Sequence, residues 1–161
     1  MKMIPFVNSD QVALVDDNDY EGVSEHRWRL RSDGYVMSSS RIGGKHLLLQ
    51  CFILKIPKGL EIDHENHDPL DNRRENLRLA THAQNMANML KPLDGKTSRF
   101  KGVCWHKASK KWQVLIGHEG KHFHLGLYKS EEEAARTYDL AALKYFRKFS
   151  RLNFPERITI E

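Results

Sequence analysis

The sequence predicts an α+β protein with a strand-rich N-terminal part, followed by a small three-stranded antiparallel sheet that packs on one helix. Two patterns predict this class. Short runs of alternating apolar and polar residues, separated by turn residues, are typical of half-buried strands. Two segments with apolar residues at helical spacing each follow a Ser or Thr that has Gln or Glu three positions later, a signal for a helix start. Strands followed by a helix in each half indicate α+β rather than a parallel α/β fold.

Strands dominate the first sixty residues of the prediction. "QVALVDD" alternates as a strand does, and Asp33-Gly34 lies between two alternating runs, which indicates a hairpin. "HLLLQCFIL" fits a buried strand or a short core helix, and the sequence does not separate the two. Pro57-Lys58-Gly59 then forms a turn before the strand "LEIDH".

A polar stretch, "EIDHENHDPLDNRRENLRLATHAQN", runs from Glu61 to Asn85. We expect a turn at "DPLDN" and a short strand at "NLRLAT", with Leu77 and Leu79 on one face. Thr81 and Gln84 fit a capping box, so a helix is expected from His82 to about Leu90. The stretch therefore reads strand, loop, strand and helix.

The C-terminal part begins after a linker. Pro, Gly and small polar residues between Met89 and Arg99 place that linker at 92–97, between domains at 1–91 and 98–156. Three strands are expected within "FKGVCWHKASKKWQVLIGHEGKHFHLGLY", with turns at Ala108–Lys110 and Glu119-Gly120. A helix follows Ser130 and carries its apolar residues at helical spacing: Ala134, Ala135, Tyr138, Ala141, Ala142 and Tyr145.

The composition of the chain limits the kinds of binding partner that we expect. No run of about 18 apolar residues is present, and the N-terminus lacks the apolar stretch of a signal peptide, so we expect no membrane partner. The two cysteines, Cys51 and Cys104, have no C-x-x-C pairing, which indicates a reducing, intracellular setting. Residues 1–90 hold 11 basic and 13 acidic residues, whereas residues 91–161 hold 15 and 8. The basic C-terminal half suits a polyanion such as nucleic acid, although a solvated basic face is equally compatible.

The polar stretch has the parts for metal-assisted hydrolysis of a phosphodiester. Asp63 and His64 end a strand, and Asn85 begins the next helix. Carboxylate and amide oxygens suit Mg²⁺, Mn²⁺ or Ca²⁺, and an adjacent imidazole can take a proton from water. Three alternatives stay open: a turn that only caps the backbone, a calcium loop that lacks its usual glycine, and zinc held by His64, His67 and His82.

The same stretch resembles the core of an HNH endonuclease, a beta-beta-alpha-metal nuclease, and most resembles the homing type common in phages and mobile introns. The Asp-His pair, "LDNRRENLR" and Thr-His-x-x-Asn carry the resemblance. It implies His64 as general base, Asp63 and Asn85 as ligands of one Mg²⁺ or Mn²⁺, and Asn76 as the residue that hydrogen-bonds His64. It also implies a phage-encoded protein that acts in the cytoplasm of a bacterial host.

One segment departs from this family. Relatives tend to carry Leu-His-Arg-Leu-Ile before the turn at Pro57, where this chain reads "LQCFI" with Gln50 and Cys51. The departure keeps open a DNA-binding regulator without catalysis. A third hypothesis is a protein that cuts or binds structured RNA.

Residues 99–156 resemble the plant ethylene-response-factor, or APETALA-two, DNA-binding domain. "KGV", "KW", "HLG", "EEAARTYDLAA" and "LNFP" carry this resemblance. It implies that the sheet lies in the major groove of DNA, and Trp105 is either a base-stacking residue or a core residue. The predicted DNA contacts in this domain are Lys101, Trp105, His106, Lys107, Lys110, Lys111, Gln113, His122 and His124.

Three arginines flank the polar stretch: Arg73, Arg74 and Arg78. They are predicted either to hold DNA phosphates or to pair with Asp71 and Glu75. Taken together, these features predict a protein that acts on double-stranded DNA and has no membrane partner and no small-molecule substrate. It is expected to be a monomer or a weak dimer. One active site in each chain favours nicking of one strand.

Overall fold

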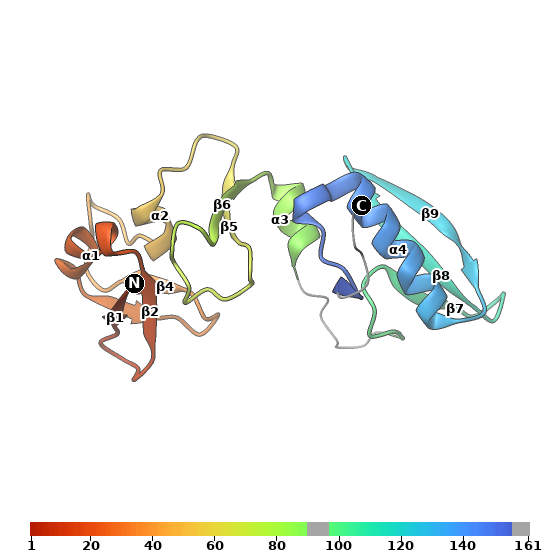
Figure 1. Ribbon diagram of the computed structural model, residues 1–161, viewed down its shortest axis with the longest axis horizontal. Coiled ribbons are helices and arrows are strands. Elements are labelled where there is room, and N and C mark those ends of the chain that lie inside the picture. Colours follow the sequence, from red (N-terminus) through yellow and green to blue (C-terminus); the bar gives the residue numbers. More distant parts are fainter. Residues whose placement is uncertain (90–96, 156–161) are drawn as a thin grey trace. The chain divides into compact units, whose positions relative to one another are not determined.

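The computed structural model describes residues 1–89 and 97–155 (Figure 1). The chain forms two compact units, Met1–His82 and Ala83–Glu161, and each is described by itself. The predicted linker at 92–97 lies outside the described residues except for Thr97, as does the predicted end of a helix at Leu90. Both units combine helices with small antiparallel sheets, as expected of an α+β protein. In the described ranges, no helix is long and apolar enough to cross a membrane.

Three two-stranded antiparallel sheets form most of the first unit. The hairpin predicted around Asp33-Gly34 is confirmed, and Gly34 has a φ of 85°, a left-handed conformation that glycine adopts without steric cost. The sheets pair β1 (Lys2–Pro5) with β2 (Val12–Val15), β3 (Trp28–Leu30) with β4 (Val36–Ser38), and β5 (Glu61–His64) with β6 (Leu77–Ala80).

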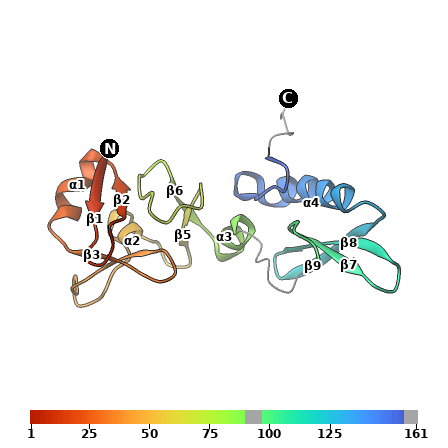
Figure 2. The ribbon, with the colours of Figure 1, turned by 90° about the horizontal axis from the view of Figure 1, so that it is seen from below.

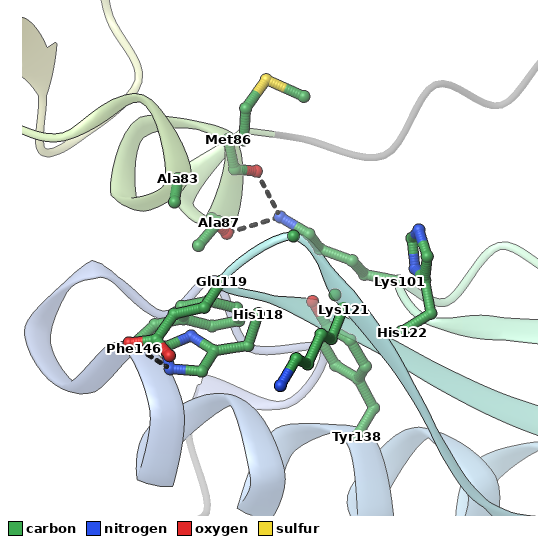
Figure 3. A pocket seen from close by; sticks show the side chains of 12 residues that line it. Ala83, Met86, Ala87, Lys101, His118, Glu119, Lys121, His122, Tyr138 and Phe146 are labelled. Atoms are coloured by element: carbon green, nitrogen blue, oxygen red, sulfur yellow. Dashed lines mark hydrogen bonds and ion pairs between the residues drawn. The ribbon is translucent and has the colours of Figure 1, made fainter.

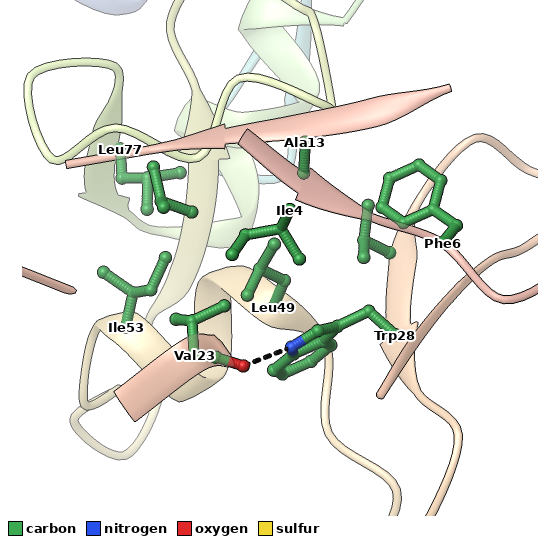
Figure 4. Packing of buried hydrophobic residues seen from close by; sticks show 10 residues of the cluster. Ile4, Phe6, Ala13, Val23, Trp28, Leu49, Ile53 and Leu77 are labelled. Atoms are coloured by element: carbon green, nitrogen blue, oxygen red, sulfur yellow. Dashed lines mark hydrogen bonds between the residues drawn. The ribbon is translucent and has the colours of Figure 1, made fainter. Parts of the chain in front are cut away.

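Two helices complete this unit. Helix α1 (Asp17–Ser24) was not predicted, and α2 (Leu49–Ile53) resolves the ambiguous apolar run as a short helix. Both helices contribute to the hydrophobic core, in which the Trp28 indole is almost fully buried and donates a hydrogen bond of 2.8 Å to the carbonyl oxygen of Val23 (Figure 4). A buried indole N–H with a partner avoids the cost of an unsatisfied donor.

The core also positions the β5–β6 hairpin and its loop. The predicted strand is confirmed as β6, in which Leu77 and Leu79 alternate with Arg78; Leu77 is buried in the core cluster, whereas Leu79 is 41% exposed. The loop is tied to β2, because the Leu14 N–H donates to Leu70 and the Leu14 carbonyl accepts from the Asn72 N–H, at 2.8 and 2.9 Å. The polar loop is therefore fixed to the sheet at its centre as well as at its ends.

The second unit contains α3 (His82–Asn88, of which His82 ends the first unit) and the predicted sheet with its helix. The sheet has the antiparallel order β7-β8-β9, and the helix α4 covers one face of it (Figure 2). The Ser130 hydroxyl accepts a hydrogen bond from the Glu133 N–H at 3.3 Å, as the capping signal predicts. The elements are β7 (Val103–His106), β8 (Lys111–His118), β9 (Lys121–Tyr128), α4 (Glu131–Phe146) and the 3₁₀ turn η1 (Arg147–Phe149).

Small residues let α4 approach the sheet closely. Ala134, Ala135 and Ala142 are fully buried, as are Val114 of β8 and, nearly so, Val103 of β7. Gly102 immediately precedes β7; its φ is 76°, and its missing side chain makes room for the Tyr138 ring. A Cβ at that glycine would lie 1.8 Å from the ring, so this position requires glycine for space as well as for conformation.

Candidate functional site

The two residues at the end of β5 are both buried. Asp63 and His64 are each 5% exposed, and as strand neighbours they point to opposite faces of the hairpin. In the register of the hairpin, Asp63 lies opposite Arg78 and His64 lies opposite Leu77. A carboxylate and an imidazole are therefore held next to each other in the chain, with different surroundings.

Asp63 is paired with Arg78. The guanidinium Nε lies 2.8 Å from the carboxylate Oδ2, and both side chains are nearly buried. A second carboxylate, that of Glu65, lies 3.3 Å from the same guanidinium. Arg78 thus forms a buried ion pair instead of extending into solvent, and its partners are Asp63 and Glu65 rather than the predicted Asp71 and Glu75.

The His64 imidazole contacts a fully buried carboxamide. Its Nε2 lies 3.3 Å from Oδ1 of Asn72, and the Asn72 Nδ2 donates to the carbonyl of Pro69 at 3.0 Å. Because the amide nitrogen is used on Pro69, the amide oxygen faces the imidazole and accepts its Nε2–H. This arrangement selects the tautomer in which Nδ1 is the basic nitrogen.

Burial also sets the charge of this imidazole. Desolvation lowers the pKa of His64, against the opposing effects of the Asn72 hydrogen bond and of nearby carboxylates such as Asp63. A histidine with a lowered pKa is neutral at neutral pH and can accept a proton. The Tyr35 ring lies 6.0 Å from the imidazole, centroid to centroid, and adds to the enclosure.

The predicted partner of His64, Asn76, has a different role. Its Oδ1 accepts a hydrogen bond from the Asn66 N–H at 2.9 Å, and its Nδ2 donates to the Asp71 carbonyl at 2.7 Å. Both ends of the carboxamide are thus used to close the loop, and the predicted bond to His64 is wrong. The sequence predicts Asn72, which makes the contact instead, only as part of the "DPLDN" turn, and nothing in the local pattern indicates this role.

The two adjacent arginines are bound by carboxylates of the same unit. Arg73 forms a two-pronged ion pair with Asp71, at 2.8 and 2.7 Å, and contacts Glu75, so the alternative of ion pairing describes it. Arg74 makes the same two-pronged contact with Asp19 of α1, also at 2.8 and 2.7 Å. This second pair, missed from the sequence, fastens the loop to α1.

The side chains predicted to bind a metal, those of Asp63 and Asn85, offer oxygen atoms as ligands. Among the described residues, no group of three or more His, Cys, Asp and Glu could hold a metal ion, which contradicts zinc bound by His64, His67 and His82. His82 instead lies 2.9 Å from the Glu61 carboxylate and is exposed. Asn85 lies in α3, in the second compact unit, so its role as a ligand stays a prediction.

The departure at "LQCFI" lies in helix α2. Gln50 is 3% exposed, and its Oε1 has no hydrogen-bond donor within the described ranges. Cys51 is half-buried, and burial raises the pKa of its thiol. This chain therefore has a buried amide and a half-buried thiol at the positions where the family resemblance leads us to expect His and Arg.

The sheet of the second unit presents a polar face away from α4. Cross-strand partners share a face, and the register pairs His106 with Lys111, Leu115 with His124 and Gly117 with His122. Of the residues that alternate with these and face α4, Val103, Val114 and Ile116 are buried. The predicted DNA-contacting residues that share the outer face are His106, Lys111, Gln113, His122 and His124.

The other predicted DNA contacts of this unit lie elsewhere. Trp105 falls on the α4 side of the sheet by alternation and packs edge-on against Trp112, with centroids 5.0 Å apart, but it is still 37% exposed and is not a core residue. Lys107 and Lys110 are exposed in the turn between β7 and β8. Lys101 extends to the C-terminal end of α3, where its ammonium donates to backbone carbonyls.

Comparison with known proteins identifies both halves. Residues 55–87 match a family model described as HNH endonuclease, and residues 98–148 match the AP2 domain. An uncharacterized HNH endonuclease, L560 of Acanthamoeba polyphaga mimivirus, is 32% identical over 147 residues, which cover 88% of this chain and 74% of that protein. The chain belongs to the HNH endonuclease family.

Two further relatives are each similar to a shorter part of this HNH endonuclease. Protein 3.8 of Escherichia phage T7 is 42% identical over 66 residues, or 41% of this chain and 54% of that protein. The ethylene-responsive transcription factor WRI1 of Arabidopsis thaliana is 51% identical over 59 residues, or 37% of this chain. The chain spans only 13% of that plant factor, so the likeness concerns a single domain.

The two matched regions correspond to distinct parts of the fold. The HNH match covers β5, β6 and most of α3, and therefore continues from the first compact unit into the second. The AP2 match covers the sheet β7–β9 and α4. The HNH endonuclease thus combines a nuclease motif with a domain of a DNA-binding type in one chain.

Proposed function

We propose that this HNH endonuclease is a metal-dependent DNA endonuclease of the homing type, which nicks one strand with His64 as general base. The observation that carries the proposal is the burial of His64 beside Asp63, with the imidazole tautomer set by Asn72 at 3.3 Å. A neutral, oriented imidazole is the form that a general base needs.

In this proposal His64 activates the attacking water, and Asp63 and Asn85 hold the metal ion. The Nδ1 atom of His64 takes the proton from a water molecule that attacks the phosphorus, and the water oxygen replaces the leaving oxygen of the DNA strand. Asp63 and Asn85 would hold one Mg²⁺ or Mn²⁺, and such an ion supplies charge stabilisation for the phosphate and the leaving oxygen. A buried carboxylate and an amide fit this ion, because Mg²⁺ commonly keeps few protein ligands and several waters.

The AP2 domain supplies the position on double-stranded DNA. Its outer face carries Lys111, Gln113 and three histidines, which can reach phosphates and base edges in a major groove. Residues 91–161 hold 15 basic and 8 acidic residues, the charge that a phosphate backbone attracts. We place the protein with a phage that acts in the cytoplasm of its bacterial host, on the basis of the likeness to phage T7 protein 3.8.

A supercoiled-plasmid assay with Mg²⁺ or Mn²⁺, with and without chelator, tests the proposal. We expect a nicked circle as the product, no product with chelator, and loss of cutting in His64→Ala with DNA affinity nearly unchanged. His82→Ala is the matched control, because His82 is exposed and interacts with Glu61 at the surface. Full cutting by His64→Ala would overturn the assignment of the base.

A DNA-binding regulator without catalysis is the second candidate. The buried Gln50, whose Oε1 lacks a donor in the part of the chain that the structure describes, favours it. The unsubstituted protein and the variant Gln50→His/Cys51→Arg, which restores the residues expected from the family, distinguish the two functions. If the protein is a regulator, the unsubstituted chain binds DNA tightly and gives no nicked product with any divalent ion. If it is an endonuclease, the unsubstituted chain cuts DNA without these substitutions.

A further inference from the structure

The side chain of Lys101 joins the AP2 domain to helix α3. Its ammonium donates to the carbonyls of Met86, at 3.3 Å, and Ala87 (Figure 3). It also donates to the carbonyl of Met89, at 2.7 Å. The last carbonyls of a helix have no intrahelical donor and carry partial negative charge, and an ammonium offers three donors. The last turn of α3 contains no basic residue of its own, so Lys101 supplies this cap from another element.

The backbone of Lys101 is itself held in place. The Asn153 side chain accepts from the Lys101 N–H at 2.7 Å and donates to the Lys101 carbonyl at 3.1 Å. Asp139 of α4 in turn accepts hydrogen bonds from the backbone and side chain of Asn153, at 2.7 and 3.0 Å. The ammonium therefore has a fixed origin at the start of the sheet, close to α4.

Apolar packing contributes less to this attachment. A cavity of about 280 Å³ lies between α3 and the turn that joins β8 to β9, lined on the helix by Ala83, Met86 and Ala87. Met86 is 50% exposed. A helix of seven residues is too short to be stable alone in water, so its order depends on such contacts with other elements.

We propose that Lys101 is a positioning residue that fixes α3 to the AP2 domain, so that the helix bearing Asn85 is held by the DNA-binding part of the chain. The Asn85 carbonyl accepts from the Met89 N–H at 3.1 Å, in the same turn that Lys101 caps. Loss of the cap therefore loosens the turn that carries Asn85. The expected effect on metal binding by Asn85 rests on the proposed function, whereas the attachment of α3 by Lys101 does not.

Two measurements on the full chain test these statements separately. Hydrogen exchange, followed by mass spectrometry, reports the order of α3 against that of β8. Manganese titration, followed by electron paramagnetic resonance of the free ion, reports the metal site without requiring cleavage. The variants are Lys101→Met, Lys101→Arg as the conservative rescue, and Lys129→Met as the control, because Lys129 is an exposed lysine of the same unit that precedes α4.

We expect Lys101→Met to speed exchange in α3 by at least about tenfold, the effect of losing one charge-assisted hydrogen bond, with β8 unchanged. Its half-saturation with Mn²⁺ should rise by a similar factor. Lys101→Arg should restore both, and Lys129→Met should alter neither. Unchanged exchange in α3 overturns the proposal. Faster exchange with unaltered Mn²⁺ affinity overturns the link to Asn85, and absence of Mn²⁺ binding in the unsubstituted protein counts against the proposed function instead.

Discussion

The buried pair between Asp63 and Arg78 makes a quantitative prediction for stability. Arg78→Met keeps the approximate volume and apolar stem of the side chain but removes its charge and its 2.8 Å contact. The Asp63 carboxylate, 5% exposed, then loses this counter-charge. Breaking a buried ion pair by removing one member costs about 3–5 kcal/mol, because the remaining charge has lost its solvation and its counter-charge. For a unit of roughly 80 residues, even about 3 kcal/mol lowers the melting temperature by roughly 12–24 °C.

The first unit has its own spectroscopic probe for this experiment. Trp28 is buried at 1% exposure in that unit, so its fluorescence follows unfolding there once Trp105 and Trp112 of the second unit are replaced by Phe. Urea titrations then give the free energy of unfolding for each variant. The Asp63→Asn substitution, combined with Arg78→Met, should recover part of the loss, since neither charge of this pair remains.

An exposed ion pair provides the matched control. Arg31 and Asp33 also approach to 2.8 Å, but their side chains are 41% and 46% exposed. Arg31→Met should therefore cost at most about 1 kcal/mol. Equal losses for Arg78→Met and Arg31→Met would refute the argument that burial makes the first pair important.

Three further outcomes are expected for the second unit. Gly102→Ala forces a Cβ to within 1.8 Å of the Tyr138 ring and should destabilise the unit by about 1–3 kcal/mol in urea titrations; a smaller loss would mean that the ring moves aside easily. Lys111→Ala should weaken DNA binding equally for all sequences and reduce the slope of log affinity against log salt by about 1 in a fluorescence titration, whereas an unchanged slope places Lys111 away from phosphate. Burial lowers the pKa of Lys101 to about 8, so between pH 8 and the ordinary value of 10.5 the unfolded chain binds this proton more tightly than the folded chain. The free energy of unfolding should therefore rise with pH in this window, compared with that of Lys101→Met. If the two proteins show the same dependence on pH, the shift is contradicted.

Strands and helices with clear periodicity could be predicted from the sequence. The β8–β9 hairpin and α4 have regular alternation or helical spacing, together with their own turn and capping residues. Helix α1 could not, because "DNDYEGVS" offers a single buried side chain, Val23, and so lacks an apolar stripe. Its helix is stabilised by contacts with the rest of the unit, including the Arg74–Asp19 pair across 55 positions of the chain, which no local pattern reveals.

In the candidate site, too, the sequence predicts local structure but not contacts between distant residues. The sequence was sufficient to place Asp63 and His64 next to each other at the end of a strand, because strand position is set by local pattern. The choice between Asn72 and Asn76 as the partner of His64 depends on how the loop folds back. Hydrogen bonds from β2 hold the Asn72 backbone, and Asn76 is used in closing the loop. Such a choice is tertiary, and two asparagines four positions apart are equivalent in a linear motif.

The arginines near the site explain why this chain needs a separate DNA-binding domain. Each predicted phosphate contact in the first unit is already bound by carboxylates: Arg73 by Asp71, Arg74 by Asp19 and Arg78 by Asp63. These pairs order the loop around His64, but they cancel the charge that would attract a phosphate backbone. Residues 1–90 hold 11 basic and 13 acidic residues, so this half has a net charge of −2 and no long-range attraction for DNA. The order of the loop around His64 and electrostatic attraction for DNA therefore compete for the same side chains, and the basic half of the chain, which contains the AP2 domain, carries the opposite charge balance.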